Sequence, residues 1–145
     1  MNVIHTDGAC RGNPGPGGWA WARGTECYAS GHEVHTTNQR MEVRAVIEAL
    51  RANDEGPIEI VSDSSYVVKC FNDKWHAGWL RRGWKNSQGK AVANRDLWEE
   101  LFLLTLNNAR PISFTWVKGH SGDAMNDFVD ELATRAADLQ RGQRT

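Results

Sequence analysis

The amino-acid sequence predicts an α/β fold in which helices pack on the faces of a mixed five-stranded sheet. Residues 2–9 alternate between apolar and polar side chains, as a half-buried strand does. Longer segments later in the chain repeat their apolar residues with helical spacing. Read in the order βββαβαααβα, these elements fit a sheet covered by helices, so we expect a single domain over residues 1–145.

The first three strands are predicted to form an antiparallel meander. Residues 2–9 contain Asp7-Gly8 at their end, and the glycine- and proline-rich residues 12–18 predict a rigid turn. Trp19–Ala22 then supplies the second strand of a hairpin. A third strand is expected at about residues 26–35.

Two further strands and five helices complete the predicted order. The strands are expected at residues 58–62 and 112–117, where β-branched and aromatic side chains gather. The helices are expected at about residues 39–53, 64–74, 76–82, 94–107 and 124–140.

Composition favours an ordinary globular protein of the reducing cytoplasm. Hydrophobic residues make up 40% of the chain and charged residues 24%, and no apolar run approaches the roughly 20 residues of a membrane span. The three cysteines include no C-x-x-C pair, which argues against a disulfide framework or a zinc site. The N-terminus carries no export signal, so we expect a cytoplasmic protein with no membrane partner.

A basic segment stands out from a nearly neutral chain. The net charge of −1 argues weakly against nucleic acid, but residues 69–95 hold seven basic residues against the single acid Asp73. Trp75, Trp79 and Trp84 alternate with these cations. Such a segment is either a small satellite core with solvated charges or a surface that follows a nucleic-acid backbone.

Glu42 is the most informative acidic residue. At about 100° per residue it lies in the middle of the apolar stripe of its helix, with Arg44 and Arg51 on the opposite side. Most helical glutamates lie on the surface, but a lone charge in a buried stripe costs several kcal/mol unless it is paired or bound to a metal. We therefore expect Glu42 to be a functional residue.

Asp7 and Asp63 each lie where a predicted strand ends. Alone, Asp63 could cap a helix and Asp7 could stabilise a turn. Both, however, occupy the place where ligands gather in open α/β sheets. Asp130 has no such signal, because the apolar stripe of its helix centres about 145° away and predicts a solvated side chain.

Two other motifs carry weaker signals. The glycine-rich residues 8–15 lack the terminal Gly-Lys-Ser/Thr of a nucleotide P-loop and lead into a strand. His120 would ordinarily be a surface histidine, although Gly119 and Gly122 beside it would let its segment move in and out of a site.

Four motifs follow one another along the chain: Asp7-Gly8 with residues 12–15, residues 37–42, residues 63–67, and residues 117–122 with Asn126 and residues 130–133. Together they resemble the bacterial type 1 ribonuclease H family over essentially the whole chain. Residues 75–92 look like the basic protrusion that some members carry. The N-terminal hybrid-binding domain that some relatives carry is not expected here, and Gln39 and Ser65 depart from residues common in the family.

The resemblance implies an endonuclease that cuts the RNA strand of RNA/DNA hybrids and leaves 5′-phosphate and 3′-hydroxyl ends. It implies Asp7, Glu42, Asp63 and Asp130 as metal ligands and His120 as an auxiliary proton carrier. It also implies hybrid contacts through Asn13, Asn38 and Gln39, a DNA phosphate held by Thr37 and Asn94, and aromatic rings of Trp75 and Trp98 near the DNA strand. From the basic segment we add Arg81, Arg82 and Lys85 as substrate-binding residues.

Four carboxylates favour Mg²⁺, with Mn²⁺ as a substitute, over zinc. The resemblance implies two ions about 4 Å apart, with Asp7 bridging both, Asp130 on the side of the attacking water, and Glu42 and Asp63 mainly on the other ion. Two rival functions are a non-catalytic hybrid-binding module, which has no need of four acids, and a DNA nuclease or transposase-like enzyme of the same fold. We expect a monomer.

Overall fold

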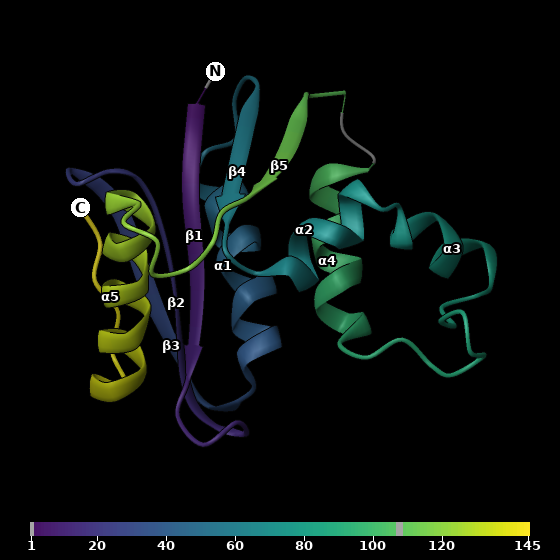
Figure 1. Cartoon of the computed structure of the whole chain (residues 1–145), viewed down its shortest axis with the longest axis horizontal. Coiled ribbons are helices and arrows are strands. Elements are labelled where there is room, and N and C mark those ends of the chain that lie inside the picture. Colours follow the sequence, from purple (N-terminus) through teal and green to yellow (C-terminus); the bar gives the residue numbers. More distant parts are fainter. Residues whose placement is uncertain (1, 107–108) are drawn as a thin grey trace.

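Five strands form one mixed sheet in the computed structural model, which describes residues 2–106 and 109–145. The strand order is β3-β2-β1-β4-β5, and β1 pairs antiparallel with β2 but parallel with β4 (Figure 1). The predicted fold class is confirmed. The strands are β1 (Asn2–Cys10), β2 (Gly15–Gly24), β3 (Cys27–Thr36), β4 (Ile58–Ser62) and β5 (Ile112–Trp116).

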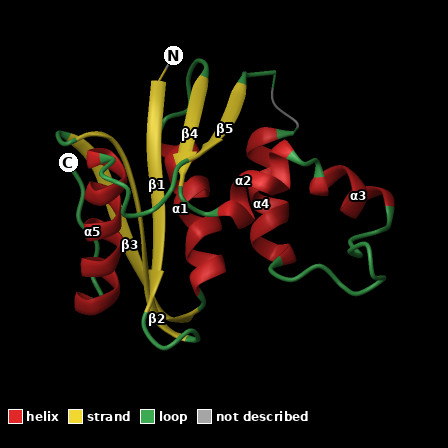
Figure 2. Ribbon diagram, in the orientation of Figure 1, coloured by secondary structure: helices red, strands yellow, loops and turns green. Residues whose placement is uncertain are grey.

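Five helices connect and cover the strands in the predicted order (Figure 2). Their ends differ from the predicted ranges by a residue or two, and residue 107 of the predicted 94–107 helix lies outside the described residues. None of the helices described in the two ranges is long and apolar enough to cross a membrane. The helices are α1 (Asn38–Ala52), α2 (Ser65–Asn72), α3 (Trp75–Arg81), α4 (Arg95–Thr105) and α5 (Ala124–Leu139).

Helices α1 and α5 pack on opposite faces of the sheet, and glycines let both approach closely. A Cβ at Gly17 would lie 2.4 Å from the Thr36 side chain and 2.9 Å from that of Met41 at the start of α1. A Cβ at the next residue, Gly18, would lie 2.3 Å from the Ala133 carbonyl oxygen of α5. Since successive strand residues face opposite sides, these two glycines mark the contact surfaces of the two helices.

The prediction of a turn over residues 12–18 is wrong at its C-terminal end. The structure begins β2 at Gly15 rather than Trp19, and Gly17 and Gly18 are strand residues that pair with Cys10 and Ala9. Glycine usually signals a turn because of its conformational freedom. Here its missing side chain matters instead, because both faces of this stretch are covered.

The larger core lies between the sheet and helices α1, α2 and α4, and the smaller one lies under α5. Helix α3 and the segment after it project from the end of the molecule farthest from α5 (Figure 1). Their base is anchored by aromatic contacts, since Trp79 lies 5.4 Å from Trp98 and Trp84 lies 5.6 Å from Phe102, ring centroid to centroid. Some of the tryptophans therefore form the satellite core that was one of the two predicted alternatives.

Candidate functional site

Two carboxylates lie where the central parallel strands stop pairing. The last β1–β4 pair joins Thr6 to Ser62, and Asp7 and Asp63 are the next residues on their chains. Beyond this pair β1 continues alongside β2, whereas the chain after β4 turns into α2. This divergence opens the sheet at a switch point of the strand order, where ligands bind in open α/β sheets.

Glu42 reaches this opening from α1. Its side chain is only 6% exposed, which confirms the prediction that it lies within the buried face of the helix. The approach depends on Gly8, because a Cβ at this position would lie 2.5 Å from the Glu42 backbone nitrogen. Among the described residues, the Glu42 Oε2 atom has no hydrogen-bond partner although it is buried.

Asp130 comes from the other face of the sheet, on α5. It is half-buried and lies within hydrogen-bonding reach of the Asp7 carboxyl group. The helical periodicity that predicted a solvated Asp130 is therefore misleading. Of the four carboxylates that the resemblance implied, the structure thus brings Asp7, Glu42 and Asp63 together, with Asp130 interacting with Asp7.

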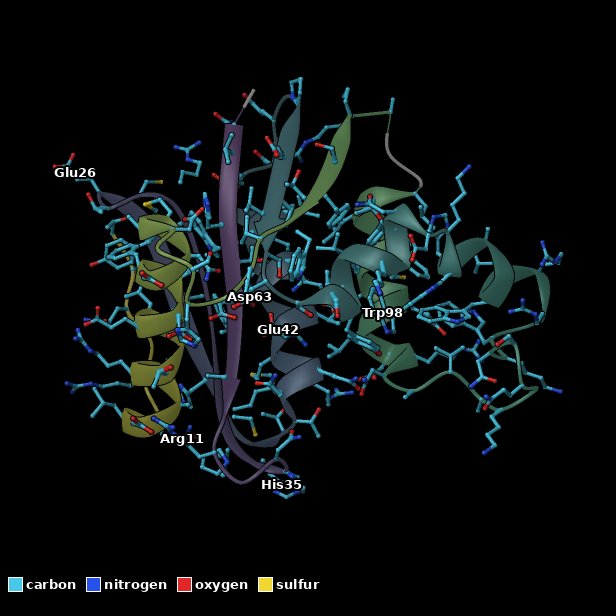
Figure 3. All side chains as sticks on the ribbon, in the orientation of Figure 1. Arg11, Glu26, His35, Glu42, Asp63 and Trp98 are labelled. Carbon is cyan, nitrogen blue, oxygen red and sulfur yellow. The ribbon has the colours of Figure 1, made fainter. Side chains whose placement is uncertain are left out.

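The four acids form a concentrated negative site. Asp7, Glu42 and Asp63 each offer an oxygen, and these oxygens lie within 4.8 Å of one another. Figure 3 places Glu42 and Asp63 side by side in the middle of the molecule. Within residues 2–106 and 109–145, no lysine or arginine forms an ion pair with any of the four acids.

Burial and mutual repulsion change how these acids ionise. Burial raises the pKa of Asp7 far above its ordinary value, and the negative charges of Glu42 and Asp63 raise it further. Burial likewise raises the pKa of Glu42, to which the charge on Asp63 contributes. A site of this kind favours a neutralising partner, either protons or a cation.

The donor set fits a hard divalent cation. All candidate ligands are carboxylate oxygens, which suit Mg²⁺ or Mn²⁺ better than zinc. The unpartnered Glu42 Oε2 is a buried acceptor that a cation would satisfy. Asp7, Glu42 and Asp63 are therefore the residues that could hold a metal, and Asp130 interacts with Asp7 beside them.

The segment that follows β5 closes over one side of the carboxylates. A Cβ at Gly119 would lie 2.9 Å from Asp63 Oδ2, so the backbone lies directly against this carboxylate. His120 is the next residue; it is exposed and adopts a left-handed backbone conformation with φ of 56°. His120, the predicted proton carrier, is thus the neighbour in sequence of a residue that lies against Asp63.

The predicted hybrid contacts gather at the N-terminus of α1. Thr37 caps the helix, its side chain accepting a hydrogen bond from the Arg40 backbone N–H at 3.2 Å. Asn13, from the β1–β2 turn, accepts a hydrogen bond from the Asn38 backbone N–H at 2.8 Å. Gln39 and Asn38 are exposed, so this end of the helix presents amides to solvent.

Asn94 lies beside this cluster, but Trp98 has a different role from the one predicted. The Asn94 Oδ1 accepts a hydrogen bond from Arg40 Nη1 at 3.5 Å. Trp98 is 0% exposed, and its indole N–H donates to the Tyr66 hydroxyl at 2.9 Å. A buried ring cannot contact a nucleic-acid strand, so we correct the expected Trp98 contact to a supporting one. Tyr66 was not predicted as a site residue, because helical periodicity shows which face of a helix is buried and not which side chains form hydrogen bonds at a site.

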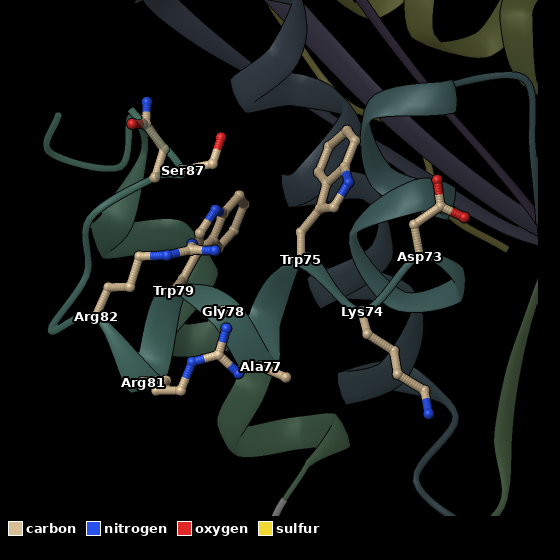
Figure 4. A pocket seen from close by; sticks show the side chains of 10 residues that line it. Asp73, Lys74, Trp75, Ala77, Gly78, Trp79, Arg81, Arg82 and Ser87 are labelled. Atoms are coloured by element: carbon tan, nitrogen blue, oxygen red, sulfur yellow. The ribbon is translucent and has the colours of Figure 1, made fainter. Parts of the chain in front are cut away.

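The remaining predicted contacts lie on the projecting α3 and the segment after it. A cavity of about 570 Å³ is lined there by aromatic and basic side chains that include Trp75, Arg81 and Arg82 (Figure 4). Trp75 is half-buried, whereas Arg81, Arg82 and Lys85 are exposed. These three cations are therefore exposed on α3 and the segment after it, which project on the side of the molecule opposite α5 (Figure 1).

Comparisons with known proteins agree with this geometry. A family model described as RNase H matches residues 1–138. A ribonuclease H from Pelobacter propionicus is 48% identical over 96% of this chain and 86% of its own length. Among solved structures, LC9-RNase H1, described as a type 1 RNase H with the type 2 active-site motif, shares 31% identity at a TM-score of 0.81, covering 99% of this chain and 76% of its own. LC11-RNase H1 in complex with an RNA/DNA hybrid has the same fold at 23% identity and a TM-score of 0.70, covering 95% and 97% of the two chains.

Proposed function

The chain belongs to the RNase H family, and from this premise we propose that it is an endonuclease that hydrolyses the RNA strand of RNA/DNA hybrids with two Mg²⁺ ions. The observation that carries the proposal is the buried carboxylate cluster, in which oxygens of Asp7, Glu42 and Asp63 lie within 4.8 Å of one another. The products would carry 5′-phosphate and 3′-hydroxyl ends.

Asp7, Glu42, Asp63 and Asp130 would hold the two ions, with Mn²⁺ able to substitute. Bound divalent ions supply Lewis-acid stabilisation of charge and lower the pKa of bound water. Asp7 lies within reach of both Glu42 and Asp130, so it is the residue best placed to serve both ions. The protein's own contribution is to hold the four carboxyl groups in one place before the metal binds.

His120 would assist by moving a proton. Its exposed side chain follows Gly119, whose backbone lies against Asp63, so the ring can reach solvent and the edge of the site. An imidazole ring can take up and release a proton during turnover.

The hybrid would lie across the rim formed by the N-terminus of α1 and the projecting α3. Asn13, Asn38 and Gln39 offer amide groups that can read 2′-hydroxyls in the minor groove of the hybrid. Thr37 and Asn94 would hold a phosphate of the DNA strand. Farther along, Trp75, Arg81, Arg82 and Lys85 would follow the same strand, since cations bind phosphates and flat rings pack on sugars or bases. One domain acting as a monomer would suffice for these contacts.

Two rival functions make different demands on the site. A module that only binds hybrids has no use for a buried cluster of repelling acids, which costs stability. A DNA nuclease of this fold would keep the acids but would gain nothing from amides placed to read 2′-hydroxyls.

A matched substrate panel tests the proposal. We would measure cleavage of the same base sequence as RNA/DNA hybrid, double-stranded RNA and double-stranded DNA, with Mg²⁺ or with chelator. We expect metal-dependent cleavage of the RNA strand of the hybrid alone. Binding without cleavage would favour the binding module, and cleavage of duplex DNA would favour the DNA nuclease.

A further inference from the structure

The hydroxyl group of Tyr66 joins two helices, α2 and α4, at the edge of the candidate site. Tyr66 lies on α2, three residues after Asp63. Its oxygen accepts hydrogen bonds from Asn94 Nδ2 at 3.2 Å and from Trp98 Nε1 at 2.9 Å, both of which belong to the start of α4. Because Trp98 is 0% exposed, this oxygen is held against a fixed part of the core.

These hydrogen bonds fix the side-chain orientation of Asn94. Its Oδ1 faces Arg40 Nη1 at 3.5 Å, and Arg40 itself is held by two hydrogen bonds to Asp96 of 2.9 and 2.7 Å. With Oδ1 and one Nδ2 hydrogen engaged, the amide cannot flip without breaking both hydrogen bonds. One Nδ2 hydrogen is left for an outside acceptor.

Donors that lack an internal acceptor gather on the same rim. Tyr66 uses its oxygen as a double acceptor, and within the described ranges no residue accepts its hydroxyl hydrogen. The Thr37 oxygen accepts from the Arg40 backbone N–H, and no described group accepts its hydrogen either. Hydroxyl and amide donors beside a guanidinium group suit an anionic oxygen such as that of a phosphate.

We infer that Tyr66 is a positioning residue for a phosphate of the DNA strand, holding Asn94 in its donor orientation and adding its own O–H to the same phosphate. The inference rests on the proposed function. It also sets the phosphate position relative to the metal site, because Tyr66 and Asp63 lie within one turn of the start of α2. The start of α2 would thus fix the position of the RNA strand at the metal site relative to that of the DNA strand at the phosphate site.

Replacement of single DNA phosphates by neutral methylphosphonates tests this assignment. Binding of the substituted hybrids would be measured with chelator present, so that no cleavage occurs. In the unmodified protein we expect one DNA position where neutralisation weakens binding by about tenfold, the size of a hydrogen bond to a charged group. In Tyr66→Phe, affinity for the unsubstituted hybrid should fall by a similar factor, and the penalty at that position should shrink to less than about twofold. The reduction in cleavage should appear in KM rather than in kcat.

The controls separate this role from a purely structural one. Tyr28, the other of the two tyrosines, lies on β3, so Tyr28→Phe should leave the penalty pattern intact. Tyr66→Phe also leaves the buried Trp98 indole without its acceptor, and Tyr66→Phe combined with Trp98→Phe removes that orphaned donor. The binding defect should persist in the double variant even where melting temperature recovers.

Two outcomes would overturn the inference: an unchanged phosphate penalty in Tyr66→Phe, or a binding defect that disappears in the double variant. An unmodified protein that neither prefers hybrid nor shows any sensitive DNA phosphate would instead overturn the proposed function itself.

Discussion

Gly8 sets how closely Glu42 can approach Asp7. A Cβ at this position would lie 2.5 Å from the Glu42 backbone nitrogen and from the Met41 carbonyl carbon, both of which are rigid backbone atoms. The Gly8 N–H also donates to Asp7 Oδ1 at 2.9 Å. The absence of a Cβ at Gly8 therefore allows β1 and α1 to hold the carboxylates of Asp7 and Glu42 close together.

We predict that Gly8→Ala pushes the start of α1 away and separates Glu42 from Asp7. Overpacking of this kind costs about 1 to 3 kcal/mol of stability, and a displacement of about 1 Å at a catalytic group costs about a hundredfold in rate. Single-turnover cleavage and thermal melts would measure both effects. Gly24→Ala is the matched control, because nothing lies within 4 Å of a Cβ there. Normal cleavage by Gly8→Ala would show that the start of α1 can shift without separating Glu42 from Asp7.

Replacement of Asp7 by asparagine should separate chemistry from binding. The variant keeps the size of the side chain but removes the carboxyl group that interacts with Glu42 and Asp130. We predict residual cleavage below about 1% and hybrid binding within about tenfold of the unmodified protein, because the phosphate contacts lie elsewhere. Gel assays of cleavage and anisotropy of a labelled hybrid would measure the two. Turnover above this level would remove Asp7 from the catalytic set.

His120 should contribute to rate without being essential. We predict that His120→Ala slows turnover by about tenfold to a thousandfold, since proton transfer helps while the metals stabilise most of the charge. Single-turnover rates across pH would measure the reduction, and His35→Ala, at an exposed position on β3, is the control. Complete inactivity of a folded His120→Ala protein would make His120 a primary ligand or base.

Sequence periodicity found Glu42 but misplaced Asp130, and the reason lies in side-chain size. The face of α5 that the structure buries contains Asn126, Ala133 and Ala137, which are small or polar. The larger Leu139 is 53% exposed. The buried residues centre about 80° from Asp130 rather than the expected 145°, so an apolar pattern weighted by large residues gives the wrong phase.

At the scale of elements, the packing of helices on the sheet explains why the order of the elements was predicted and why the start of β2 was not. The strand and helix order followed from periodicity, because each element buries one face. The start of β2 did not, since glycine marks turns and tightly packed strands alike. Gly18 belongs to a tightly packed strand because α5 lies against it: a Cβ at Gly18 would lie 2.6 Å from the Ala137 backbone nitrogen. The sequence alone does not show this contact.

The projecting α3 and its following segment form the second functional element. Its tryptophans differ in burial, although Trp75 and Trp79 both line the outer cavity. Trp79 is 9% exposed and anchors the base against Trp98, whereas Trp75 is half-buried. Interleaved aromatic and basic residues in the sequence could not show how deeply each ring is buried.

We predict that neutralising Arg81, Arg82 and Lys85 together weakens hybrid binding and reduces its salt dependence. For each phosphate that is no longer neutralised by the protein, the log–log slope should decrease in magnitude by about 0.7 to 0.9. Binding measured across a range of salt concentrations gives the slope. A matched triple substitution of Arg23, Arg135 and Arg141, all exposed elsewhere, should leave the slope unchanged. An equal effect of both triples would mean that net charge alone matters.

At the scale of the whole molecule, the carboxylate cluster and the basic projection lie in different places. The net charge of −1 conceals a group of four acids near the centre and the exposed cations Arg81, Arg82 and Lys85 on the segment that projects at one end. This separation allows one duplex to present its scissile strand to cations held by the acids while the other strand contacts the projection. The acids must then be held together by the fold when no metal is present, and that should cost stability.

We predict that Asp7→Asn is more stable than the unmodified protein at neutral pH without metal, by about 2 kcal/mol. The pKa of Asp7 is raised by burial and by the charges of Glu42 and Asp63, so the folded state binds a proton that the unfolded state has released. Stability of the unmodified protein therefore falls as pH rises from about 4, the unfolded value, through neutrality. The asparagine variant lacks this group and should escape the decrease.

The advantage should shrink under two conditions. Below about pH 4 the Asp7 carboxyl is protonated in both states of the unmodified protein, so its raised pKa no longer matters. Added Mg²⁺ should stabilise the unmodified protein by binding its native cluster, and should stabilise the variant less. Urea unfolding at acid and neutral pH, with chelator or Mg²⁺, measures all four conditions. Asp54→Asn, at an exposed position outside the site, should change stability little in any of them. If Asp7→Asn were instead less stable without metal at neutral pH, Asp7 would be held by favourable hydrogen bonds, and repulsion among the acids would not govern the stability of this site.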